Sequence, residues 1–132
     1  MPHFLRHLPC RTLTSGLLTL FVALSASPAF ARTLEVGPGK PFTKPSEAAA
    51  AAQDGDHIAI AKGEYFDCAW WKASNLVIEG AGPADTVITD KTCGGKALFI
   101  AAGRNITIRN LTLTRARVPD GNGAGIRRKA RV

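Results

Sequence analysis

The feature that most constrains the fold is a series of short apolar runs that recur after Gly55. Each run is about three to five residues long, and most place apolar residues two positions apart, which is the period of a strand with one buried face. Gly, Asn and Asp separate the runs. The runs are Ile58-Ala59-Ile60, Leu76-Val77-Ile78, Val87-Ile88, Leu98-Phe99-Ile100, Ile106-Thr107-Ile108 and Leu111-Thr112-Leu113.

Two segments of this region resemble each other thirty residues apart. Residues 74–80 read SNLVIEG and residues 104–110 read RNITIRN. A repeat spaced about 20–50 residues apart is typical of a solenoid, in which each coil buries its apolar side against the next coil. Ile108 and Leu111 are three positions apart, so Asn110 predicts a corner, because Asn tolerates left-handed backbone.

A solenoid assigns each side of these strands to the core or to the solvent. Thr107, Arg109, Thr112 and Thr114 are expected to face outward. The expected inward stacks comprise Ile58, Ile60, Leu76, Ile78, Leu98, Ile100, Ile106, Ile108, Leu111 and Leu113. The alternative is a small antiparallel sandwich, which needs longer strands and two-residue turns such as Asp120-Gly121.

One helix is expected before the first of these runs. Pro45-Ser46-Glu47 suits a first helical turn, because Pro presets the backbone and Glu faces the positive end of the helix dipole. An alanine run from Ala48 to Ala52 follows, and Gly55 ends the pattern. The apolar surface of this helix consists almost entirely of methyl groups, so it can lie close against something flat.

The first 31 residues are expected to form a signal peptide. Arg6 and Arg11 precede an apolar stretch, Gly16–Ala26, and Ala29-Phe30-Ala31 offers a cleavage site before Arg32. The alternative, a membrane anchor, needs about 20 apolar residues. We therefore expect an exported protein in the periplasm or outside the cell, with no stable membrane span in the mature chain.

The formal net charge of +7 is concentrated at the C-terminal end. Residues 105–132 contain seven basic residues and one acidic residue, whereas residues 32–104 contain eight and nine. A basic end suits an anionic partner such as acidic polysaccharide, phospholipid or nucleic acid. Four of the charges lie in residues 127–132, so an incidental tail is the simpler interpretation.

Two cysteines, Cys68 and Cys93, remain in the mature chain. An even pair in an exported protein predicts a disulfide. A metal site is not expected, because the mature chain has one histidine, His57, and no closely spaced cysteine pair. No cofactor is expected either.

The motifs of residues 42–126 together resemble the N-terminal part of the pectin lyase-like superfamily of right-handed parallel β-helix proteins. The resemblance lies in an Ala-rich helix, then Asp54-Gly55-Asp56-His57-Ile58-Ala59-Ile60-Ala61-Lys62-Gly63-Glu64-Tyr65, and then the two related segments 74–80 and 104–113. It implies an all-β solenoid whose N-terminal end is capped by a short α-helix. It implies no single activity, because one fold carries many functions.

The resemblance also bears on the extent of the protein. About three rungs can be built from this chain, near the lower limit for a stacked array. We expect residues 32–126 to form the cap and first rungs, and residues 127–132 to be a basic tail, which a shifted reading frame after Ile126 would explain. The chain would then be a fragment of a longer carbohydrate-associated protein.

The leading hypothesis is an exported β-helix module that is not itself catalytic and that has a carbohydrate-binding or scaffold role. Acidic polysaccharide is the candidate partner, and no nucleic acid partner is expected. The alternative is the N-terminal part of a polysaccharide lyase or glycoside hydrolase whose active rungs lie elsewhere. Catalytic residues are not identifiable from the sequence. Calcium ligands are not expected among the loop acids, which are Asp67, Asp85, Asp90 and Asp120, because their spacing matches no known ligand pattern.

Trp70 and Trp71 are the candidate carbohydrate contacts, because aromatic faces suit the apolar faces of sugar rings. In a strand, one ring would point inward and the other outward. The alternative is that one Trp belongs to the core and the other covers the capping helix. His57 is expected to be a structural residue, because no nucleophile motif accompanies it.

Overall fold

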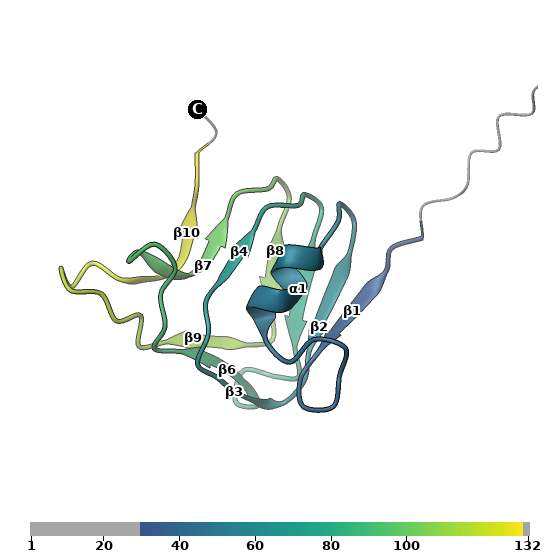
Figure 1. The fold of residues 1–132 in the computed structure, drawn as a ribbon, viewed down its shortest axis with the longest axis horizontal. Coiled ribbons are helices and arrows are strands. Elements are labelled where there is room, and N and C mark those ends of the chain that lie inside the picture. The colour runs from purple at the N-terminus through teal and green to yellow at the C-terminus, as the bar shows by residue number, and fades with distance from the viewer. Residues whose placement is uncertain (1–29, 131–132) are drawn as a thin grey trace, which may run out of the picture.

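The computed structural model describes residues 30–130, which contain ten strands and one helix (Figure 1). The expected signal peptide therefore lies almost entirely outside the described residues. The elements are β1 (Thr33–Val36), α1 (Pro45–Ala51), β2 (His57–Ile60), β3 (Gly63–Tyr65), β4 (Ala69–Trp71), β5 (Val77–Gly80), β6 (Thr86–Thr89), β7 (Ala97–Ala101), β8 (Thr107–Arg109), β9 (Thr112–Thr114) and β10 (Ala124–Arg128).

The strands form three parallel sheets, and each strand pairs with the equivalent strand one turn of the chain later. Sheet A has the order β1-β2-β5-β8, sheet B has β3-β6-β9, and sheet C has β4-β7-β10. The chain thus winds through three coils: coil 1 is β2-β3-β4, coil 2 is β5-β6-β7 and coil 3 is β8-β9-β10. This topology confirms the predicted parallel solenoid and contradicts the antiparallel sandwich.

The core is built from in-register stacks of apolar side chains. In sheet A, Leu34, Ile58, Ile78 and Ile108 lie on consecutive strands at matching positions. In sheet B, Tyr65, Ile88 and Leu113 form the equivalent stack. The expected stack of sheet A is therefore confirmed, whereas in sheet B only Leu113 was expected and Tyr65 and Ile88 were not. Each coil depends on its neighbours to bury its apolar surface.

In sheet C, the structure differs from the prediction of which β7 side chains lie on the inner side of the strand. Phe99 is aligned with Ala69, and its ring lies edge-on to Trp71 with 5.5 Å between the ring centroids. Because side chains alternate along a strand, Leu98 and Ile100 point to the opposite side from Phe99. Both side chains are buried as expected, Leu98 completely and Ile100 with 6% exposure, but they lie on the opposite side of β7 from Phe99, since three consecutive apolar residues do not specify which phase faces Trp71.

The helix α1 packs against β4 and β1 and so covers the N-terminal end of the core (Figure 1). Ala48 and Ala49 are its buried alanines, which confirms a close approach through methyl groups. The helix ends at Ala51, a little earlier than the sequence suggested. Its first turn is held from coil 1, because the buried carboxylate of Asp67 accepts a 2.8 Å hydrogen bond from the Ser46 N–H.

Coil 3 extends further than the sequence indicated. We expected a basic tail after Ile126, but β10 continues through Arg128. Ile126 is aligned with Phe99 and Arg127 with Ile100, so the inward and outward alternation persists across the expected boundary. Two of the arginines assigned to the tail are therefore strand residues. No helix among residues 30–130 is long and apolar enough to cross a membrane.

Candidate functional site

The outer side of sheet C brings an aromatic ring, an aliphatic side chain and a cation into one row. Trp70 of β4 is aligned with Ile100 of β7, and Ile100 is aligned with Arg127 of β10. Parallel strands lie about 4.8 Å apart, so this row runs along the axis of the coils. We name this surface the sheet C face; it comprises Trp70, Lys72, Lys96, Ile100, Arg127 and Lys129.

Two lysines flank the half-buried Trp70 ring on the sheet C face. The Nζ atom of Lys129 lies 4.7 Å from the ring centroid, and that of Lys72 lies 5.9 Å away. Contacts of this kind contribute about 0.5–1 kcal/mol each at exposed sites. Neither lysine forms an ion pair with a carboxylate among the described residues. Their charges therefore remain available to an anionic ligand.

A depression of about 360 Å³ lies beside this row. Its lining includes Trp70, Ile100, Gly94 and Lys96, together with the C-terminal residues 127–130. The depression has an apolar floor of one aromatic and one aliphatic side chain, and its rim is cationic. That combination suits a flat ligand with an apolar face and negatively charged substituents.

The predicted disulfide is confirmed, and it borders the sheet C face. Cys68 and Cys93 are joined, with 5.5 Å between their Cα atoms. Cys68 immediately precedes β4, which carries Trp70, and Cys93 immediately precedes Gly94. The bond thus ties the segment leading into β4 to the loop that forms one side of the depression.

The two candidate tryptophans lie on opposite sides of sheet C. Trp71 is completely buried and packs against Phe99, so its ring is out of reach of a ligand. Trp70 is half-buried and faces outward. The structure thus leaves Trp70 as the carbohydrate-contact candidate. Sequence reasoning missed the cations around it, since Lys72 and Lys129 are 57 residues apart in the chain.

A second polar cluster crosses sheet A. Glu79 of β5 accepts hydrogen bonds from Arg109 of β8 at 2.9 Å and from Asn110 at 3.0 Å, and His57 of β2 lies 3.2 Å away. The hydrogen bond from Arg109 is the main reason that the pKa of Glu79 lies below its ordinary value. Glu79 therefore stays ionised at neutral pH and joins three coils, and His57 takes the structural place expected for it.

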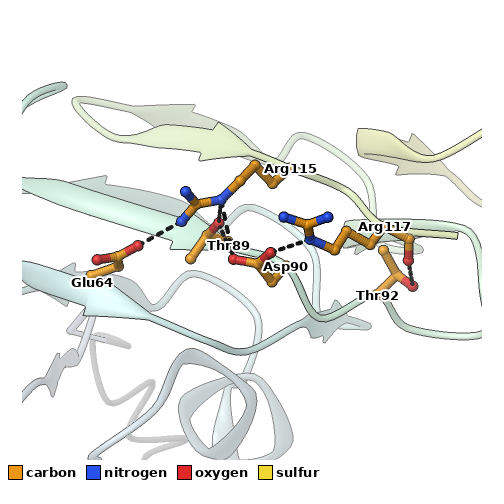
Figure 2. A network of polar contacts seen from close by, with 6 residues as sticks. All are labelled: Glu64, Thr89, Asp90, Thr92, Arg115 and Arg117. Atoms are coloured by element: carbon orange, nitrogen blue, oxygen red, sulfur yellow. Dashed lines mark hydrogen bonds and ion pairs between the residues drawn. The ribbon is translucent and has the colours of Figure 1, made fainter.

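A third cluster joins sheet B to the segments that follow it (Figure 2). Arg115 donates to Glu64 at 2.8 Å on one side, and to Thr89 at 3.0 Å and Asp90 at 3.2 Å on the other. Arg117 also donates to Asp90. The pKa of Asp90 is lowered, chiefly by the hydrogen bond from Arg117. These arginines neutralise carboxylates of earlier coils, and no sequence pattern pointed to them.

The loop acids do not form a shared site. Asp67 caps α1, Asp85 lies 3.5 Å from Lys62, Asp90 binds the two arginines, and Asp120 accepts from the Asn122 N–H. Among residues 30–130 no group of three or more His, Cys, Asp or Glu residues could hold a metal ion. Each of these acids is thus occupied by a hydrogen-bond or ion-pair partner within the fold.

No protein-family model and no curated protein matches this chain. Among solved structures, a pectin methylesterase variant in complex with a hexasaccharide superposes with a TM-score of 0.59. The sequence identity is 17%, and the match covers 71% of this chain. It covers 38% of the esterase, so this chain spans well under half of that protein's length. The likeness confirms the right-handed parallel β-helix fold predicted from the sequence.

Proposed function

We propose that the chain is an exported β-helix module that binds acidic polysaccharide on the sheet C face, with Trp70 as the stacking platform. The observation that carries the proposal is the Trp70 ring, flanked by Lys129 at 4.7 Å and Lys72 at 5.9 Å. The apolar face of a sugar ring packs on an indole, while its carboxylate meets the adjacent ammonium groups. The structural neighbour, a pectin methylesterase in complex with a hexasaccharide, supports a carbohydrate ligand.

We further propose that the described coils bind rather than catalyse. Proton-transfer catalysis needs a group whose pKa lies near the working pH. The pKa values of Glu79 and Asp90 are instead lowered by arginine partners, and both carboxylates are held in ladders between coils. Export is supported by the disulfide, since such bonds persist in oxidising compartments.

The test is a calorimetric titration of the oxidised protein with polygalacturonate. Replacing Trp70 by Ala is expected to weaken binding about tenfold, or about 1.4 kcal/mol. Because the lysines contribute through charge, affinity is also expected to fall as salt rises. An uncharged dextran is the ligand control and should bind far more weakly.

Phe66→Ala is the matched control variant, because Phe66 is 64% exposed and does not line the depression. This variant should bind polygalacturonate as the unaltered protein does. Equal affinities of the Trp70→Ala and Phe66→Ala variants would remove the sheet C face as the binding site. Release of unsaturated or shortened products from polygalacturonate would instead favour the lyase or hydrolase alternative.

A further inference from the structure

A tight turn lies in the loop between β6 and β7, at one side of the depression on the sheet C face. Gly94 and Gly95 both have left-handed backbone, with φ of 57° and 61°, a conformation that suits glycine. The Lys96 N–H donates to the Cys93 carbonyl at 3.0 Å and closes the turn. We name residues 93–96 the glycine turn. Gly94 and Lys96 both line the depression, so the glycine turn forms one of its walls.

Packing does not fix the tip of the glycine turn. A Cβ atom built on either of its glycines meets no atom within 4 Å, and both glycines are exposed. The base of the turn is held instead. Two hydrogen bonds, from the Thr92 hydroxyl at 3.1 Å and from the Ala124 N–H at 3.0 Å, tie this loop to coil 3. The Cys68–Cys93 disulfide ties it to coil 1.

The disulfide fixes the glycine turn relative to Trp70. Cys68 stands two positions before Trp70, a spacing that places both side chains on one side of an extended chain. Cys68 is only 7% exposed, and its Cα atom lies 5.5 Å from that of Cys93. The bond therefore holds the base of the turn beside the strand that carries the ring.

Lys96 supplies a positive charge to this wall of the depression. It is exposed and forms no ion pair among residues 30–130. Lys62 differs, because its ammonium group lies 3.5 Å from Asp85. Lys91 is a second exposed lysine of the same loop that has no ion pair in the described part of the chain, but it does not line the depression. Lys96 and Lys91 thus share a loop and differ in whether they border the binding surface.

We propose that the glycine turn makes the sheet C face prefer charged to neutral polysaccharide, because the disulfide holds Lys96 beside a sugar stacked on Trp70. The turn then reads ligand charge at the site of the function proposed above, on which this role depends. An ionised uronate carboxylate pairs with the Lys96 ammonium group, whereas the methyl ester of the same sugar offers no charge. Stacking on Trp70 uses the apolar face of the sugar ring, which both forms share.

The test compares polygalacturonate with its fully methyl-esterified form in calorimetric titrations of the oxidised protein. Lys96→Gln is expected to weaken polygalacturonate binding about threefold and to leave binding of the ester unchanged, because one exposed charge pair is lost. Lys96→Arg keeps the charge and should retain most of the affinity. Lys91→Gln is the matched control, and it should bind both ligands as the unaltered protein does.

A double-mutant cycle tests whether the disulfide acts by positioning Lys96. In the Cys68→Ala/Cys93→Ala protein, Lys96→Gln is expected to have little further effect, because the turn no longer holds the ammonium group beside the ring. A bond that only stabilised the fold would leave the effect of Lys96→Gln at its full size. Circular dichroism at the titration temperature verifies that the coils remain folded.

Gly95→Val displaces the turn with the disulfide in place, and so provides a second variant if the cysteine-free protein unfolds. A β-branched residue is strained at a φ of 61°, while no atom within 4 Å opposes its Cβ. Gly95→Val is expected to weaken polygalacturonate binding about threefold, as Lys96→Gln does. Gly39→Val is its control, because Gly39 also has a positive φ of 72° and open space around it but lies in the loop between β1 and α1.

Three results would overturn the proposal. The first is equal affinity of the Lys96→Gln and Lys91→Gln variants for polygalacturonate. The second is an effect of Lys96→Gln that is the same for the methyl ester, or the same with and without the disulfide. The third is a Gly95→Val variant that binds as Gly39→Val does. If the unaltered protein does not bind polygalacturonate at all, the function proposed above fails, and this role of the glycine turn fails with it.

Discussion

At the scale of single residues, the coils depend on positions where no side chain fits. A Cβ atom added at Gly103 would lie 1.9 Å from the backbone oxygen of Ala73, one coil earlier. Gly103→Ala is therefore expected to lower the free energy of unfolding by about 3 kcal/mol, because the neighbouring backbone must move. Gly82→Ala is the control, since its nearest neighbour is the Asp85 side chain at 3.1 Å. Urea unfolding of both variants tests this difference, and similar midpoints would contradict it.

Asparagines mark the corners of the coils, and the sequence predicted one of them, Asn110. Asn75 and Asn105 both have left-handed backbone, with φ of 56° and 51°, and the Asn105 side-chain amide donates to the Asn75 side-chain oxygen at 3.1 Å. Asn110 also has a positive φ of 56°. This agrees with its position between Ile108 and Leu111, where the alternation of apolar residues shifts by one position. The Asn110 corner was predictable because backbone conformation is a local property of a residue. Arg115 was not, because Glu64 lies 51 residues earlier.

At the scale of elements, β1 is joined to the start of coil 1 by an ion pair between the half-exposed Arg32 and the buried Asp56. The Asp56 carboxylate is 3% exposed and accepts from Arg32 at 2.7 Å and from the Gln53 N–H at 2.8 Å. The hydrogen bond from Arg32 is the largest cause of the lowered pKa of Asp56. A lowered folded pKa stabilises the fold above the ordinary aspartate pKa, and this contribution is lost as the pH falls through the folded value.

Arg32→Gln is expected to lower the stability of the fold at pH 7, and only modestly because the arginine side chain is 49% exposed. The difference from the unaltered protein should shrink as the pH falls below the ordinary aspartate pKa and Asp56 becomes protonated in the folded state. Urea unfolding at several pH values provides the measurement. Lys40→Gln removes a surface pair with Glu35 at 3.6 Å and should change stability by less than about 0.5 kcal/mol. A cost for Arg32→Gln that does not vary with pH would refute this account.

Within single elements, the apolar periodicity located the strands but did not always predict which side chains of a strand face the core. Ile58, Ile78 and Ile108 alternate with polar or small residues, so their burial followed from the pattern. In β7 all three central residues are apolar, and the decision depends on which side chain can pack against Trp71. That contact joins two coils, so the local sequence does not determine it. The sheet C face was equally hidden, because it combines residues of all three coils.

At the scale of the whole molecule, the disulfide is the one covalent cross-link, besides the backbone, between coils 1 and 2 among the described residues. It closes a loop of about 26 residues, which corresponds to about 3.5 kcal/mol in the loop-entropy model. Reduction is therefore expected to lower the thermal midpoint by more than 10 °C in a domain of this size. Circular dichroism melts with and without reductant measure the shift, and the Cys68→Ala/Cys93→Ala variant should be insensitive to reductant. Identical melts of the oxidised and reduced protein would contradict the prediction.

The helix that covers one end of the core also sets an order of events for a chain that is synthesised from its N-terminus. The helix α1, strand β1 and strand β4 all lie within residues 33–71, so their mutual contacts can form before residues of coils 2 and 3 have emerged. Each later coil then meets a finished template and adds to it, as in a quasi-one-dimensional array. Folding should therefore proceed in one direction, and pauses in synthesis after residue 71 should be harmless while substitutions within α1 delay every later step.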